Sequence, residues 1–433
     1  MEDANVQWYS RPRPAILGWG KDVGLGLRTR ASLQKKGLIF SSKIPPRDIL
    51  THLLACTRGT PLQEITTLRE LTPGKEYAFH LHPAAEPVTV EFTDSDVTLD
   101  APTSRTGPGY HAFLVSKLDL LASVLGLRWE WGADADSTGY ARDRNFESLQ
   151  RQMTAFLDVL FMNLRRSAGA QGPTDMKILM PADFGAKARK DEILTPLCQL
   201  DIATLETWAN ASAEQHMDAA EQLFPWWEEG FGGAFYRGIA LHSFWMELRW
   251  ATPLDKSEAQ AIERTVNWGA RALQLEAELS LPKSAMDELR ALMSGTPQPF
   301  ANPEGIGYRR RQFSVVLGDW TFEIPGSLVQ DWDSKDKLLF ESVGFEGSAT
   351  AATLDPEEDA EGRRSAPGEV KKERGFWPAD DGEGFVLDAV ARTPSADGPD
   401  RLCMMKIWMV DEALRAAAEA IADSVTLLKS QQT

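Results

Sequence analysis

Apolar positions in the first 144 residues repeat at intervals typical of both helices and strands. Apolar residues between Ile49 and Leu54 recur at helical spacing directly after two prolines, which suit a helix start. A second helix is predicted over Tyr110–Leu125, where leucines recur along one face. Four short runs bounded by turn-forming residues predict strands. These runs are Glu76–Leu81, Val88–Phe92, Val97–Leu99 and Leu127–Trp131.

The next stretch, residues 145–300, has the periodicity of helices instead. One irregular part contains Ile178–Met180, which we interpret as a short strand that extends the first sheet. Otherwise the segment is predicted to be a helical domain. Its helices are expected over Phe146–Leu164, Leu200–Met217, Phe235–Trp250, Ser257–Leu279 and Lys283–Met293.

Residues 305–433 return to a mixed pattern, so the predicted fold class is α+β: an N-terminal α/β domain, a central helical domain and a C-terminal α/β domain. Leu402–Val410 is apolar at both odd and even positions, which predicts a central strand with both faces covered. A helix is expected over Asp411–Leu428. The other strands are predicted over Arg311–Gly318, Asp319–Ile324, Lys337–Val343, Ser348–Leu354 and Gly384–Ala391.

Residues 355–381 interrupt this pattern. The segment is rich in charged residues, proline and glycine, and has few large apolar side chains before Phe376 and Trp377. Such a composition buries too little surface to offset the entropy of ordering. We therefore predict a mobile surface loop, and a partner that binds or cleaves it is one possible mode of regulation.

Composition narrows the class of function. The chain has 433 residues, of which 43% are hydrophobic, and 46 basic against 63 acidic residues give a net charge of −17. This charge disfavours a nucleic-acid binder that works by counterion release. No apolar run approaches the roughly 20 residues of a membrane span, and the polar start lacks the pattern of a signal peptide. The three cysteines are far apart in sequence, so a soluble protein of a reducing cytoplasm is expected.

Two patterns point weakly to metal chemistry. Asp134, Asp136 and Thr138 alternate before a glycine as in the first half of a calcium loop, but the twelfth position is Asn145 rather than an acid. The alternative for this segment is a turn between a strand and a helix.

The second pattern is His80 and His82, which would share one face of a strand without a third zinc ligand nearby. No catalytic motif for hydrolysis or phosphoryl transfer occurs. We therefore predict no catalytic residue, no metal and no cofactor. The alternative function is a metal-dependent hydrolase that uses Asp134, Asp136, His80 or Glu228.

The most distinctive stretch is the aromatic segment Phe224–Trp250. Aromatic side chains at helical spacing commonly form core, but Trp, Tyr and Arg also dominate protein interfaces. The chain has 14 Trp and only 6 Tyr, which favours a role in binding proteins. The predicted partner-binding residues are Trp226, Trp227, Glu228, Glu229, Phe231, Tyr236, Arg237, Phe376 and Trp377.

Two parts of the chain resemble known families. Trp320-Thr-Phe-Glu-Ile-Pro-Gly-Ser327 at the end of a hairpin, followed by strands and a C-terminal helix, is similar to PsbP/Mog1-like domains. Three runs, Gly107–His111, Asp136–Tyr140 and Phe224–Glu228, resemble an uncharacterised bacterial family associated with immunity-type proteins of toxin or defence loci.

These resemblances imply binding modules and no catalytic residues. The predicted function is therefore non-enzymatic: an immunity-like or adaptor protein of a bacterial conflict system. Its acidic surface would suit a basic protein partner, such as a toxin or effector.

Overall fold

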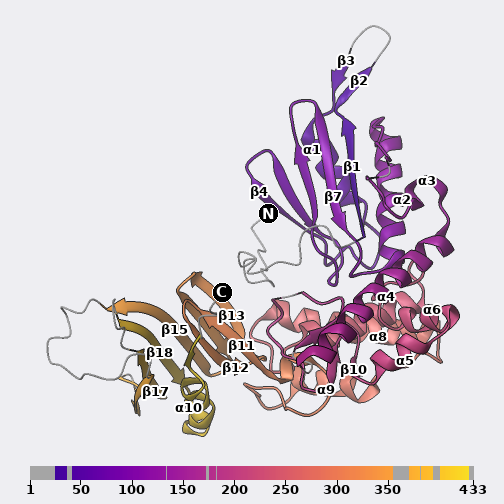
Figure 1. Ribbon diagram of the computed structural model, residues 1–433. Helices are drawn as coiled ribbons and strands as arrows, with labels where there is room; N and C mark the ends of the chain where they lie inside the picture. Colours follow the sequence, from indigo (N-terminus) through magenta and orange to yellow (C-terminus); the bar gives the residue numbers. More distant parts are fainter. Residues whose placement is uncertain are drawn as a thin grey trace.

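The computed structural model shows a fold that mixes helices and several sheets, with 36% of residues helical and 29% in strands (Figure 1). This confirms the predicted mixture of α and β; the finer division into three domains stays a prediction. The structure describes residues 25–36, 41–132, 134–171, 175–181, 183–354, 370–380, 382–393 and 400–428.

The first sheet has five antiparallel strands in the order β1-β7-β6-β5-β4. Its strands alternate between buried and exposed residues, and helices α1 and α2 pack against the buried face. Helix α2 begins at Pro108 and ends at Leu125, and the next residue, Gly126, has a φ of 70°, which suits glycine. The bounds are β1 Gly26–Ser32, β4 Thr67–Thr72, β5 Glu76–His80, β6 Val88–Phe92, β7 Asp96–Pro102, α1 Pro46–Ala55 and α2 Pro108–Leu125, with a small β2–β3 pair at Gln34–Lys36 and Ser41–Lys43.

The predicted strand at Leu127–Trp131 is wrong. Only a single bridge joins Trp129 to Ala31 of β1, and the Trp129 indole donates a hydrogen bond to the Leu118 carbonyl of α2. The segment therefore runs beside the sheet in an irregular conformation.

The helical part confirms most of the predicted helices but divides two of them. A capping box between Ser212 and Gln215 starts a new helix inside Leu200–Met217. The helix predicted over Phe235–Trp250 turns into a π-helix and ends at Glu247, and Trp250 has a φ of 58°. The bounds are α3 Tyr140–Asp143, α4 Phe146–Gln171, α5 Thr204–Asn210, α6 Ala213–Glu221, α7 Gly233–His242, η1 Ser243–Glu247, α8 Lys256–Leu275 and α9 Lys283–Ser294.

A small sheet between α4 and α5 corrects another prediction. Ile178–Met180 does not extend the first sheet, because the neighbouring strand β8 (Met176–Lys177) pairs with β9 (Glu192–Leu194), which pairs with β10 (Gln199–Asp201). This sheet is tied to the C-terminal part of the chain. The hydroxyl of Tyr308 donates to the Thr195 and Cys198 carbonyls, at 3.0 and 2.6 Å.

The C-terminal part holds the predicted hairpin and a six-stranded antiparallel sheet in the order β13-β14-β15-β18-β17-β16. Helix α10 lies against β17, β18 and β12 and covers one face of the large sheet (Figure 1). The bounds are η2 Tyr308–Arg310, β11 Gln312–Leu317, β12 Trp320–Pro325, β13 Val329–Ser334, β14 Lys337–Ser342, β15 Phe345–Leu354, β16 Lys371–Pro378, β17 Phe385–Thr393, β18 Asp400–Met409, η4 Glu412–Leu414, α10 Arg415–Asp423 and β19 Thr426–Leu427.

Three predictions for this part need correction. The helix predicted over Asp411–Leu428 is shorter, because η4 precedes α10 and β19 follows it. Part of the predicted loop 355–381 is strand β16, and residues 355–369 lie outside the described residues. Strand β18 is central, as predicted, but only one of its faces is buried, since Met404 and Lys406 are exposed.

Buried apolar side chains form two clusters. The first runs from Leu27 to Leu292 and joins the N-terminal sheet to the helices, with Trp226 and Trp250 among its largest members. The second runs from Met180 to Val425 and fills the C-terminal sheets, together with side chains of the small β8–β10 sheet.

Candidate functional site

The aromatic segment Phe224–Trp250 contributes mainly to the first core. Trp226 has no exposed surface, and its ring lies 4.7 Å from Phe235 and 5.3 Å from Phe113. A side chain at Gly109 would overlap the Trp226 ring, so this glycine lets α2 approach the indole. Trp227 is only 6% exposed. The partner-binding role predicted for Trp226 and Trp227 therefore lacks the exposed surface that direct contact with a partner requires.

The remaining predicted residues of this segment lie at or near the surface. Glu228 and Glu229 are exposed, whereas Phe231, Tyr236 and Arg237 are partly buried. Partial desolvation of its carboxyl group and the nearby carboxylates of Glu221 and Glu276 raise the pKa of Glu228, although a hydrogen bond with Gln150 opposes this shift. The surface of this segment thus carries several carboxylates beside the guanidinium group of Arg237.

Arg237 and Trp227 also line a small pocket of about 240 Å³ between α6, α7 and the α8–α9 connection. The guanidinium of Arg237 donates to the Gln222 side chain at 2.8 Å and to the Ser280 carbonyl at 3.3 Å. Glu221 and Glu278 complete the charged part of the lining. Charged groups of both signs therefore line the pocket.

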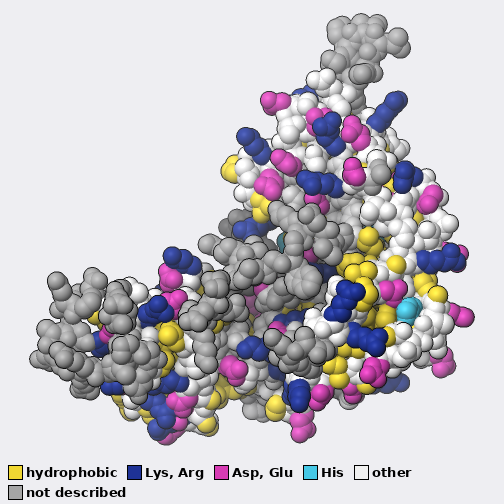
Figure 2. Space-filling model, viewed as in Figure 1, with side chains coloured by type: hydrophobic (Ala, Val, Ile, Leu, Met, Phe, Trp, Pro, Cys, Tyr) yellow, Lys and Arg dark blue, Asp and Glu magenta, His cyan; other side chains and the backbone are white. Residues whose placement is uncertain are grey.

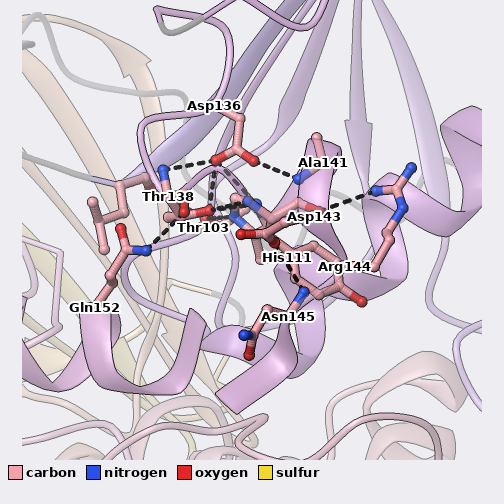
Figure 3. Close-up of polar contacts among 11 residues, drawn as sticks. Thr103, His111, Asp136, Thr138, Ala141, Asp143, Arg144, Asn145 and Gln152 are labelled. Atoms are coloured by element: carbon pink, nitrogen blue, oxygen red, sulfur yellow. Dashed lines mark hydrogen bonds and ion pairs between the residues drawn. The ribbon is translucent and has the colours of Figure 1, made fainter. Parts of the chain in front are cut away.

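The segment that resembles a calcium loop forms a closed polar network (Figure 3). The buried carboxylate of Asp136 accepts hydrogen bonds from the Thr138 hydroxyl at 2.6 Å and the Ala141 amide at 2.7 Å, and the His111 ring lies 3.5 Å away. Burial alone would raise the pKa of Asp136, but hydrogen bonds from His111, the Ala141 amide and Thr138 outweigh it and hold this pKa well below its usual value. The chain's own donors therefore occupy this carboxylate.

The other positions of that loop do not converge on Asp136. Asp134 is exposed, and the side chain of Asn145 accepts from the Ser148 amide at 2.9 Å, at the start of α4. The alternative was a turn between a strand and a helix; the segment is a turn that leads into helix α3, but among the described residues no strand directly precedes it. Within the described ranges, no group of three or more His, Cys, Asp or Glu side chains is placed to hold a metal ion.

The two histidines considered for zinc also have separate surroundings. His80 ends β5, whereas His82 follows the strand and is buried among Tyr110, Trp226 and Phe235. Burial holds the pKa of His82 well below its usual value, so the ring is neutral at physiological pH. His82 is thus a core residue of the aromatic cluster.

Phe376 and Trp377 lie on strand β16 and point to opposite faces of the sheet. Phe376 stacks on Phe385 at 5.5 Å, and the guanidinium of Arg415 lies 4.2 Å from its ring centre, so it belongs to the covered side. Trp377 is 48% exposed, and its ring lies over Gly375, where any side chain would overlap it. Of the nine predicted partner-binding residues, Trp377 is the one that stands on an exposed apolar surface.

That surface, which we call the Trp377 face, is the side of strands β14, β15, β18, β17 and β16 that faces away from α10. Along each strand, the side chains of this face alternate with buried side chains that point to the other side of the sheet. Four of them are more than a third exposed: Leu339, Trp377, Val390 and Met404. The half-exposed Val386 and Trp408 belong to the same face.

Sequence reasoning missed most of this face. The signal was present in Leu402–Val410, where apolar residues at alternate positions exceed what one buried face needs. We interpreted these additional apolar residues as a second buried face of the strand, whereas the structure exposes Met404.

Comparison with known proteins finds no matching family model and no similar curated protein. The resemblances to PsbP/Mog1-like domains and to immunity-type proteins therefore stay predictions. No helix in the described part of the chain is both long and apolar enough to cross a membrane.

Proposed function

We propose that the protein binds another protein, without chemistry on it, through the Trp377 face. The observation that supports this is the number of large apolar side chains on one side of one sheet, where Met404 stands opposite Val390 and Trp408 stands opposite Val386, next to Trp377. Single exposed apolar side chains are normal, but contiguous ones mark interaction surfaces. This is the class of function predicted for an immunity-like or adaptor protein.

The shape and composition of the face fit such a role. Its apolar side chains form two groups, Trp408, Val386 and Trp377 in one and Met404 and Val390 in the other, and the pair Lys406 and Asp388 lies between them. Protein interfaces combine apolar and polar contacts in this way, and tryptophan is enriched in their hot spots.

The test is affinity purification of the tagged chain from extracts of its own cells. The variant Val390→Glu/Met404→Glu places two charges on the Trp377 face, and Leu275→Glu/Met293→Glu places two on exposed apolar positions of α8 and α9. We expect the wild type and the helix variant to retain the same protein, and the sheet variant to lose it. Equal retention by all three would contradict the proposal.

A further inference from the structure

We infer that the Trp377 face receives a basic amphipathic helix of the protein partner; this deepens the proposed function and rests on it. Three observations lead to this occupant: a pair of opposed carboxylates, the span of the exposed apolar side chains, and small residues at the centre of the face.

The carboxylates are those of Glu341 and Glu346, which stand directly opposite each other on β14 and β15. Like charges in this position destabilise a sheet. Neither side chain forms an ion pair or a hydrogen bond with another residue that the structure describes. A lysine or arginine placed between the two carboxylates would remove their repulsion, which gives the face its charge complementarity.

The carboxylates adjoin the apolar part of the face. Glu346 is opposite Trp408 of β18, which in turn is opposite Val386 of β17, and Val386 is opposite Trp377. One row of the sheet therefore runs from two acids to two tryptophans. A partner segment along this row must carry a positive charge at one end and apolar side chains at the other.

The other charges near the centre are balanced. Lys406 stands opposite Asp388 in the register of β17 and β18, so opposite signs face each other there. Lys337, Lys371, Glu373 and Arg392 add charges of both signs elsewhere on the face, so Glu341 and Glu346 are a local excess of negative charge beside the tryptophans.

The span fits a helix. The exposed apolar side chains extend from β14 to β16, which is four strand spacings or about 19 Å. A helix of about 13 residues has this length. Beyond Glu346, strand β15 presents the small side chains of Ser348 and Thr350 beside Leu339, Lys406 and Met404 of its neighbours, which lets a helix backbone approach this part of the sheet. Helices are also the elements that ordinarily cover a sheet face.

The probe is a stapled 18-residue helix of leucine and lysine, with a leucine–glutamate helix of the same design as its control. Binding is measured by calorimetry to the wild type, to Glu341→Gln/Glu346→Gln, and to Glu206→Gln/Glu214→Gln. The last variant changes the net charge equally on α5 and α6, away from the face.

We expect Glu341→Gln/Glu346→Gln to weaken binding of the lysine helix at least tenfold and to raise the Tm of the free protein, because repulsion between the carboxylates is lost. The α5/α6 variant should bind like the wild type, and the glutamate helix should not bind. Val390→Glu/Met404→Glu should abolish binding of the lysine helix.

Failure of this inference is distinguishable from failure of the proposed function. If Val390→Glu/Met404→Glu loses the natural partner but Glu341→Gln/Glu346→Gln changes neither Tm nor lysine-helix binding, the inference is overturned and the proposed function stands. If Val390→Glu/Met404→Glu keeps the natural partner, the proposed function falls as well. Analytical sedimentation is a further test. If the wild type is a dimer and Val390→Glu/Met404→Glu alone is a monomer, the Trp377 face binds a second copy of this chain, and the inference of a partner helix is overturned.

Discussion

The two largest sheets differ in what they present on their uncovered sides. On the N-terminal sheet, Arg28 stands opposite Asp100 with 3.7 Å between their charged groups, and basic and acidic side chains intersperse over β1, β7 and β4 (Figure 2). Each sheet also has two acids that stand opposite each other, Glu76 and Glu91 on the first and Glu341 and Glu346 on the second. The C-terminal sheet differs in its apolar content, because Leu339, Trp377, Val390 and Met404 are each more than a third exposed on one side. A bound partner would remove this apolar surface from water.

The largest expected effect separates the two sides of the C-terminal sheet. Ile407 is buried, so Ile407→Ala should lower the free energy of unfolding by about 4 kcal/mol. Met404→Ala, on the same strand but on the Trp377 face, should cost about 0.5 kcal/mol or less. Urea denaturation measures both, with Leu99→Ala and Thr98→Ala as the matching pair on β7. Equal losses at Ile407 and Met404 would show that the Trp377 face is covered.

The next effect concerns Asp136, near the N-terminal sheet. Asp136→Asn replaces an acceptor of three donors and should cost about 2–3 kcal/mol at pH 7. Because the folded pKa of Asp136 is depressed, its contribution is complete above the unfolded pKa of about 4 and declines as pH falls towards the folded pKa. Denaturation at pH 7 and pH 3 checks this, with the exposed Asp134→Asn as control. A difference from wild type that is constant over this range would contradict it.

The smallest effects reverse sign between the two sheets. Arg28→Glu puts an acid beside Asp100 and should destabilise the protein by about 0.5 kcal/mol, whereas Glu341→Lys puts a base beside Glu346 and should stabilise it by a similar amount. Thermal unfolding at low and high salt checks both, since salt should reduce each effect. The same sign for both substitutions would remove the contrast between the sheets.

Local patterns predicted the regular elements well. The helix ending before Gly126 and the hairpin around Gly318 are fixed by neighbouring residues, and the structure confirms both. Strand β16 was missed because its charged sequence resembles a loop. Its order comes from distant partners: Arg374 pairs with Asp423 of α10 at 2.8 Å, and its backbone pairs with β17.

The candidate site was harder to predict for the same reason. Exposure is a property of the folded sheet, so the sequence of β18 alone did not show that Met404 is uncovered. The aromatic content of the sequence also did not distinguish buried from exposed tryptophans, since Trp226 lies in the core while Trp377 is exposed. The opposition of Glu341 and Glu346 requires the register of β14 and β15, which follows from their antiparallel pairing.

The tie between Thr195 and Tyr308 bears on how the chain folds during its synthesis. These residues are 113 positions apart, and Met180, Ala186 and Leu194 share a core with the C-terminal strands. At translation rates of about 5–20 residues per second, Thr195 is synthesised roughly 6–23 s before Tyr308. During that interval Met180, Ala186 and Leu194 are open to chaperones, and a premature stop codon before Tyr308 would leave them so permanently.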